Sequence, residues 1–484
     1  MATVREVQDI KQQFARFKFE GPCAEHRDSK TQQAERQDLD AATEGVSNIT
    51  LDGSGESSKQ VICAAQPLEE KPLQPDFVML AGIFSNKFDS ENDARFGCCM
   101  KVEVELLHSS PDTCTFIIYF GAEDESPKAF PTHLQARVEK PRPGNPLFST
   151  AAVQRLAHRQ LPVYVPKVWG FGETLNGDGV GLHYLLTQHY EDVVTADQIW
   201  HKFNGPVQRA LVEDVARLME PLSCGGLPFS SSQDTAFLTH KNVIPKGLED
   251  AWVAGGTESG WHTDFKSFLM TALAPGQAKH ELETRQDGSL VVTDTFYKDR
   301  TLLPQQVVFT PDNLEVLWNT CGLRHNNLEP CNILLRERPT DFGPGYEFVA
   351  IINWDAAGFF PLVYETAMMD IGLGLRSRNA DWYEELREYA DVMYQERWGG
   401  RNLALESHEK LAEALWLVNT SRKRSQGFHV GNRFQKKWLQ REKFVKFGTA
   451  LDGFKRQKGW RHKSYTEADD QKLEAEAMAE LGYL

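Results

Sequence analysis

The sequence lacks the signals that would assign it to a secreted, membrane-bound or zinc-stabilised class of protein. Its 484 residues include eight cysteines, but none forms a Cys-x-x-Cys pair and no Cys/His cluster has zinc spacing. No apolar run reaches the about 18 residues that a membrane span needs. The first residues, MATVREVQDIKQQF, have no apolar core of signal-peptide length. These absences predict a protein of the reducing cytosol, with free thiols and no membrane span.

The chain also lacks an excess of positive charge, because its formal net charge of −15 argues against a general nucleic-acid binder. One segment departs from this balance. Residues 422–463 carry 14 Lys and Arg against Glu442 and Asp452, a local charge of +12 that leaves −27 for the remainder. Aromatic residues are interleaved with the basic ones. We expect this segment to dock on the acidic body, and the alternatives are a nucleic-acid or anionic-lipid contact and nuclear import through residues 422–424.

Composition and periodicity divide the chain into four segments. Residues 1–75, rich in Ser, Gln, Glu, Asp and Gly, are predicted to form a mostly disordered arm that begins with a short amphipathic helix. Residues 76–192 are strand-rich with one main helix, and residues 193–420 have mainly helical periodicity. Residues 421–484 form the basic, helical extension. The length leaves room for two or three domains, or for one two-lobed domain with extensions.

The expected elements of the two central segments are short strands followed by longer helices. In the first, strands are expected at 96–107, 114–122, 133–139, 163–172 and 183–190, with a helix at 150–159. In the second, helices are expected at 207–218, 262–273, 311–320 and 379–420, interrupted by strands at 332–337 and 348–354.

One pair of neighbouring stretches has the spacing of phosphoryl-transfer chemistry. The first is LRHNNLEPCNILL, in which Asn332 follows Asn327 by five residues, and the second is AIINWDAAGFFP, in which Asn353 lies 21 residues beyond Asn332. Kinase-like enzymes use a loop carboxylate to orient the acceptor hydroxyl, a nearby Asn to bind magnesium, and an Asp from the next hairpin to hold metal against the phosphates. A short strand between the stretches would bring all three positions around one point.

These stretches resemble two motifs of the aminoglycoside phosphotransferase and choline kinase-like family. They match the patterns His-Gly-Asp-Leu-x-Pro-x-Asn-Ile-Leu and Ile-Ile-Asp-Trp-Glu, and fungal members share the pattern that here reads NWDAAGFFP. Weaker similarities precede them in VYVPKVWGFG, HYLLTQHYED and HLQARVEKP, so the resemblance extends over about residues 90–400. It implies an α+β, two-lobed protein-kinase-like fold, with a strand-rich N-lobe and a mainly helical C-lobe. It also implies ATP and Mg²⁺ in the cleft between the lobes.

The resemblance assigns roles by position. His325 is the loop histidine, which packs and hydrogen-bonds to hold the loop, and Asn332 is the metal-binding asparagine. Arg137 is the basic residue of the third strand, with Lys140 as the alternate, and a plain surface salt bridge is the competing interpretation of Arg137. The resemblance also places Gln188 and His189 in the hinge and reduces the glycine-rich turn to Gly97.

Several positions depart from the family pattern. Asn327 stands where the family has its catalytic Asp, and Asn353 stands where it has its metal-binding Asp. The helix glutamate that partners the basic strand residue falls at Thr150 or Ala151. An amide preserves the shape of a carboxylate but is a neutral, weaker magnesium ligand that cannot accept a proton. Losing a general base costs about 10² to 10⁴ in rate, so the departures predict a strongly impaired phosphotransferase.

Three interpretations remain open from the sequence. The favoured one is a pseudokinase that binds a nucleotide, a small metabolite or a partner protein. The second is an active, ATP-dependent small-molecule kinase in which Asp355, two residues after Asn353, holds the metal. Glu329 is the nearest other carboxylate in the loop. The third is different chemistry on the same fold, because a fold does not fix a function.

Overall fold

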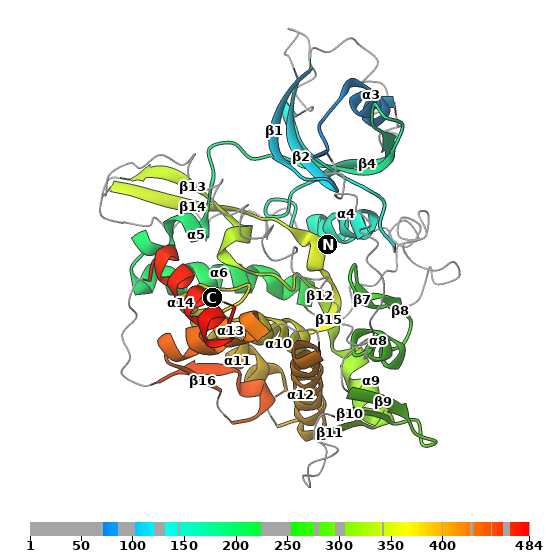
Figure 1. The fold of residues 1–484 in the computed structure, drawn as a ribbon, viewed down its shortest axis with the longest axis vertical. Coiled ribbons are helices and arrows are strands. Elements are labelled where there is room, and N and C mark those ends of the chain that lie inside the picture. The colour runs from blue at the N-terminus through cyan, green and yellow to red at the C-terminus, as the bar shows by residue number, and fades with distance from the viewer. Residues whose placement is uncertain are drawn as a thin grey trace, which may run out of the picture.

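The structure is a computed structural model with two lobes, one built on a sheet and the other rich in helices (Figure 1). It describes residues 71–85, 102–120, 131–143, 146–223, 253–274, 280–295, 305–340, 343–398, 400–425, 429–446, 448–457 and 465–483. The predicted helix near the N-terminus and Gly97 lie outside these residues. Among the described residues, no helix combines the length and apolar character needed to cross a bilayer.

The N-lobe is built on an antiparallel five-stranded sheet of order β1-β2-β3-β5-β4. Apolar residues of β3 on one face, such as Ala136 and Val138, pack with Met79 and Ile83 of helix α3. The opposite face packs against helix α4, where Leu147 and Ala151 meet Leu185 of β5. The elements are α3 (Phe77–Ser85), β1 (Val102–Ser109), β2 (Thr113–Phe120), β3 (His133–Glu139), α4 (Pro146–Gln160), β4 (Val168–Leu175) and β5 (Gly181–Gln188).

The C-lobe packs long helices around the predicted motif loop. The loop leaves β12 and enters β13, which pairs with β14 in an antiparallel hairpin. The main elements are β6 (Val194–Thr195), α5 (Ala196–Ile199), α6 (Gly205–Ser223), α9 (Pro311–Asn319), β12 (Cys321–Arg324), β13 (Ile333–Thr340), β14 (Gly343–Ile351), β15 (Gly358–Pro361), α10 (Leu362–Gly372), α11 (Ala380–Trp398) and α12 (Asn402–Ser425). The predicted α+β fold, with a strand-rich N-lobe and a mainly helical C-lobe, is confirmed.

The C-lobe contains more strands than the sequence periodicity indicated. Besides the predicted hairpin, the structure forms a three-stranded sheet of order β11-β10-β9 and a four-stranded sheet of order β12-β15-β7-β8. The additional elements are β7 (Ala254–Gly256), β8 (Gly260–His262), α8 (Phe265–Ala272), β9 (His280–Thr284), β10 (Leu290–Asp294) and β11 (Gln306–Phe309). Most of these strands have three to five residues, too few for a period of two to stand out in the sequence.

The C-terminal extension docks on the C-lobe through aromatic side chains. Helix α13 (His429–Arg441) is followed by the β16–β17 hairpin (Phe444–Lys446 and Phe454–Arg456) and by α14 (Glu467–Glu480). Buried residues of all four elements share one cluster with residues of the C-lobe: Phe434, Trp438, Phe444, Phe454 and Ala477 with Leu373, Ala380 and Tyr383. This packing agrees with the intramolecular docking that the charge asymmetry favoured.

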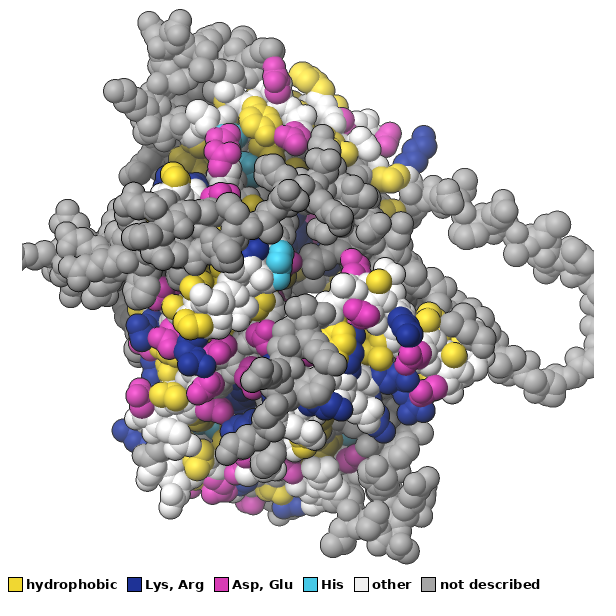
Figure 2. Space-filling model, turned by 90° about the vertical axis from the view of Figure 1, so that its left-hand side faces the viewer, with side chains coloured by type: hydrophobic (Ala, Val, Ile, Leu, Met, Phe, Trp, Pro, Cys, Tyr) yellow, Lys and Arg dark blue, Asp and Glu magenta, His cyan; other side chains and the backbone are white. Residues whose placement is uncertain are grey.

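Acidic partners neutralise much of the described basic extension. Lys437 of α13 lies 2.7 Å from Glu480 of α14. Arg441 is paired with Asp470 at 2.7 Å. Arg456 of β17 is paired with Asp381 of α11, again at 2.7 Å. On the face in Figure 2, Lys and Arg lie interspersed with Asp and Glu over the lower lobe, and the described residues there form no continuous basic patch.

Candidate functional site

The loop after β12 has the shape that the motif predicts, with an asparagine at its tightest turn. Asn326, at the family's Gly position, adopts a left-handed conformation with φ of 58°. Asparagine tolerates this region better than most side chains. Its backbone N–H donates to Glu365 of α10 at 2.8 Å, and its Nδ2 donates to the Ala356 carbonyl at 2.9 Å. The turn is therefore tied both to the C-lobe and to the second motif.

His325 is held as a neutral, structural side chain. It is fully buried, and its Nε2 lies 2.9 Å from the Ile352 carbonyl, which requires a proton on Nε2. The Nδ1 atom accepts from the backbone N–H of Asn327 at 3.3 Å. Burial lowers the pKa of His325 to about 4. A histidine with both nitrogens engaged by backbone holds the two motif stretches together and has no free atom for proton transfer.

We expect this burial to make the fold sensitive to acid. The unfolded chain binds a proton on His325 with an ordinary pKa near 6.5, whereas the folded chain does so only near pH 4. Above pH 6.5 the histidine is neutral in both states and does not affect stability. As the pH falls from 6.5 to 4, protonation of the unfolded chain lowers the free energy of unfolding, by roughly 3 kcal/mol in total. Urea unfolding at stepped pH measures it. His325→Gln keeps a donor near the Nε2 position and should lose stability less steeply toward pH 4.

The exposed His201 provides the matched control for this prediction. His201→Gln removes one histidine without touching the loop, so its pH dependence should follow the wild type. Equal slopes for His325→Gln and the wild type would contradict the structural assignment of His325.

The three asparagines at the catalytic and metal positions lie together and are hydrogen-bonded in sequence. Asn332 is buried, and its Nδ2 donates to the backbone carbonyl of Asn327 at 2.8 Å. This bond turns the Asn332 Oδ1 toward Asn353, whose Nδ2 donates to it at 3.3 Å. Asn353 adopts a left-handed conformation with φ of 62°. The structure thus brings the predicted metal positions together, but one presents a donor where a cation requires an oxygen.

Asp355, the other candidate metal ligand, contacts the N-lobe. Its Oδ2 is paired with Nη1 of Arg137 on β3 at 2.5 Å. Its Oδ1 accepts from the Thr150 hydroxyl on α4 at 3.2 Å. Both carboxylate oxygens are therefore engaged by residues of the opposite lobe. Thr150 is one of the two positions, with Ala151, at which the resemblance expects the missing helix glutamate.

A second carboxylate, which the sequence analysis did not single out, supports Arg137. Glu139 follows Arg137 by two residues on β3, so both side chains lie on the same face of the strand. Its Oε2 is paired with Nη2 of Arg137 at 3.1 Å and with Nη2 of Arg142 at 2.6 Å. Glu139 thus supplies from the strand the carboxylate that the helix lacks. The period of two along HLQARVE was the available signal for it.

The expected hinge lies at the end of β5, where Gln188 is the last residue of the strand and the half-buried His189 follows it. Gln188 pairs within the sheet, and its backbone N–H donates to the Lys167 carbonyl at 2.8 Å. The His189 ring lies 5.3 Å from the His133 ring, edge to face. Burial, and then His133, lower the pKa of His189. His133 in turn lies 3.2 Å from Glu191. His133 of β3 therefore contacts both His189 and Glu191 at the end of the sheet.

Lys140, the alternate to Arg137, is paired outside this cluster. Lys140 lies 3.2 Å from Asp112, in the turn that connects β1 and β2. In protein kinases a glycine-rich hairpin turn covers the phosphates. The β1–β2 turn here reads Ser-Pro-Asp at 110–112, with no glycine and one carboxylate. Gly97, the predicted remnant of that turn, precedes β1 and lies outside the described residues.

The side-chain partner of Glu329 is Ser377, which is not one of the three asparagines. This partly buried residue precedes a short turn of helix, Pro330–Asn332, and its carboxyl interacts with the Ser377 hydroxyl before α11. Burial raises the pKa of Glu329 to about 7. The nearest carboxylate in the loop sequence thus interacts with Ser377 of the C-lobe.

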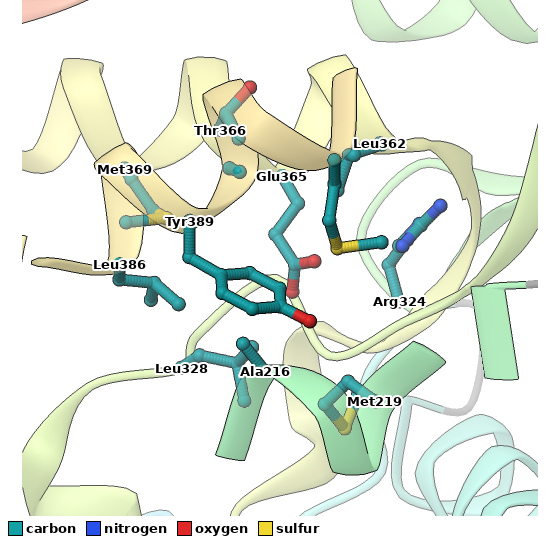
Figure 3. Close-up of a pocket in the computed structure, with 12 residues that line it drawn as sticks. Ala216, Met219, Arg324, Leu328, Leu362, Glu365, Thr366, Met369, Leu386 and Tyr389 are labelled. Carbon is teal, nitrogen blue, oxygen red and sulfur yellow. The ribbon is translucent and has the colours of Figure 1, made fainter. Parts of the chain in front are cut away.

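A small cavity lies behind the loop, between α6, α10 and α11 (Figure 3). Its volume is about 40 Å³, enough for a few water molecules but not for a metabolite. Glu365 and Tyr389 point into it from α10 and α11, and Arg324 lies at its edge. Burial raises the pKa of Glu365, and Arg324 opposes that shift. The cavity lies among side chains that support the loop, and it is too small to bind the substrate that would accept a phosphate.

Comparison with known proteins returned similarity only at the level of solved structures. No family model matches the chain, and no curated protein sequence matches it. Aminoglycoside phosphotransferase APH(4)-Ia is 15% identical, with a TM-score of 0.37, and the match covers 70% of this chain and 91% of that one. A proposed fructosamine-3-kinase from Haemophilus somnus 129PT is 14% identical, with a TM-score of 0.33, and the match covers 75% of this chain and 98% of that one. Spectinomycin phosphotransferase APH(9)-Ia, in complex with ADP and spectinomycin, is 11% identical, with a TM-score of 0.24, and the match covers 70% of this chain and 90% of that one.

Two of these solved structures are named as phosphotransferases and the third as a fructosamine-3-kinase. Their TM-scores are all below 0.5, so none of them assigns a function to this chain.

Proposed function

We propose that this chain is a kinase-fold pseudokinase that binds a nucleotide or a small metabolite between its lobes and transfers phosphate poorly. The observation that carries the proposal is the hydrogen bond from Asn353 Nδ2 to Asn332 Oδ1 at 3.3 Å. Two side chains that should both offer oxygen to Mg²⁺ instead satisfy each other. The orientation of the Asn332 amide follows from its other bond: its Nδ2 donates to the Asn327 carbonyl, so its Oδ1 is the atom that faces Asn353.

Charge supports the same proposal. Mg²⁺ prefers carboxylate ligands with octahedral geometry, and it neutralises the charge that develops on the phosphates. The positions of both expected aspartates are neutral here. Among the described residues, no hydrogen bond engages the Asn327 side chain, and an amide there cannot take the acceptor's proton. A bound ATP would meet little of the apparatus that activates its γ-phosphate.

The alternative, an active small-molecule kinase that uses Asp355 for the metal, finds less support. Asp355 would have to leave Arg137 and Thr150 before it could hold a cation. That exchange would expose the carboxylate to the metal but break an ion pair between the lobes. Phosphoryl transfer depends on positioning more than on base catalysis, which keeps this alternative testable.

The proposal predicts nucleotide binding that does not depend on magnesium. In a thermal-shift titration, ATP in excess EDTA should raise the melting temperature as much as ATP with Mg²⁺, because binding stabilises the fold by mass action. Asn353→Asp restores one metal carboxylate and should make the shift magnesium-dependent. A wild type that responds to ATP only with magnesium, and that hydrolyses ATP or phosphorylates an added hydroxylated metabolite, would support the active kinase instead.

A further inference from the structure

Arg137 has two carboxylate partners that differ sharply in exposure. Glu139 has a side chain that is 1% exposed, and it lies on the same strand as Arg137. The Asp355 side chain is 39% exposed and belongs to the other lobe. A buried partner on the same strand is a permanent part of the N-lobe, since leaving it would strand a buried charge. A half-exposed partner on another lobe can exchange with a ligand from solvent.

The contacts of Asp355 describe the shape of that ligand. Arg137 Nη1 holds one carboxylate oxygen at 2.5 Å, and the Thr150 hydroxyl holds the other at 3.2 Å. Two donors that grip two oxygens on one centre are suited to a carboxylate or a phosphate group. Both donors come from the N-lobe, β3 and α4, so the site remains formed when the C-lobe carboxylate withdraws.

The local charge favours a replacement anion. Without Asp355, the group formed by Arg137, Glu139 and Arg142 carries a net positive charge. Glu139 bridges the two arginines through one oxygen and fixes Arg137 beside Thr150. An arriving oxyanion would therefore meet an oriented guanidinium whose charge is only partly compensated, and no metal ion is needed to neutralise it.

We infer that Arg137 and Thr150 form an oxyanion site whose built-in occupant is the Asp355 carboxylate, which a ligand's phosphate or carboxylate group displaces. The inference rests on the proposed function only for the statement that the oxyanion belongs to a nucleotide. It assigns to Asp355 the role of an internal competitor, the reverse of a metal ligand. Removing the Asp355 charge should then strengthen anion binding, whereas removing a metal ligand would weaken it.

Isothermal titration calorimetry in EDTA tests the sign of this effect with three probes: inorganic phosphate, ADP and adenosine. Asp355→Asn should bind phosphate and ADP roughly three- to tenfold more tightly than the wild type, because the competing state no longer lowers the apparent affinity. Adenosine affinity should be the same in both proteins. Asp178→Asn, in the exposed β4–β5 turn, is the matched control for the change in net charge and should bind all three like the wild type.

A second substitution separates the site from a general loss of negative charge. Thr150→Val removes only the hydroxyl, and in the Asp355→Asn background it should reverse most of the gain in phosphate affinity. Phosphate and ADP affinities that stay unchanged or fall in Asp355→Asn would overturn the inference. The adenosine titration tests the proposed function separately. If no variant binds adenosine or ADP but Asp355→Asn gains affinity for phosphate, the oxyanion site is supported and nucleotide binding is contradicted.

Discussion

A variant that carries both Asn327→Asp and Asn353→Asp should turn over ATP with magnesium at least about 100-fold faster than the wild type. A general base contributes about 10² to 10⁴ in rate, and a metal carboxylate adds stabilisation of the charge on the phosphates. The backbone accepts the change at 353, because aspartate tolerates the left-handed conformation that Asn353 adopts. Steady-state turnover with a panel of hydroxylated and amine metabolites measures the effect.

The same variant should become dependent on a cation for stability. Asn332 keeps its Nδ2 on the Asn327 carbonyl, so its Oδ1 would face a carboxylate at 353 in place of an amide donor. Two facing oxygens repel each other until a cation lies between them. Mg²⁺ should therefore raise the melting temperature of the double variant and leave that of the wild type unchanged.

The control for this restoration is Asn176→Asp in the β4–β5 turn. The Asn176 Oδ1 accepts from the backbone N–H groups of Asp178 and Val180, which a carboxylate can do equally well. It adds one negative charge, as each of the two single variants does, in an exposed turn outside the motif loop, and it should not change turnover. Because residues of one catalytic unit are not additive, each single variant is expected to recover much less than the pair. If the wild type already turns over ATP as fast as the double variant, the two asparagines do not limit phosphate transfer.

The loop geometry could be predicted from sequence because it is local. His325, Asn332 and the strand that follows are close along the chain, and the motif fixes their spacing. The contacts of Asp355 could not be predicted in the same way, since 218 residues separate it from Arg137. The sequence indicated Asp355 as a candidate metal ligand. The structure adds Arg137 and Thr150, the N-lobe partners that a metal ion would have to displace from it.

Glu139 shows a second limit of the sequence. The missing helix glutamate was visible in the sequence as a departure at Thr150 or Ala151, but no substitute for it was identified there. The geometry of β3 supplies it, because alternate residues share a face and the turn after the strand brings Arg142 back to the same carboxylate. Pattern matching asks whether a motif residue is present, whereas the physical requirement is a buried carboxylate beside the arginine, from any element.

Replacing Trp438 by alanine should destabilise the C-lobe by about 3–5 kcal/mol, as removal of a buried aromatic side chain does. Trp438 is 1% exposed and lies at the centre of the cluster that joins the extension to the lobe. Its ring stacks on Phe444 at 6.1 Å, and Gly374 leaves room for it, because a Cβ there would lie 2.9 Å from the indole. Urea unfolding followed by circular dichroism measures the change.

Tyr483→Ala is the matched control, because this aromatic is 58% exposed at the end of the same extension and should cost less than about 0.5 kcal/mol. The comparison also tests what the basic segment does. If Trp438 anchors it, Trp438→Ala should release basic side chains from their acidic partners. The variant should then show salt-sensitive nucleic-acid binding in a filter assay, and we expect none from the wild type. Strong binding by the wild type would instead mean that the docked extension already presents a nucleic-acid surface. An equal, small loss of stability in both variants would show that the extension adds little to the fold despite its buried aromatics.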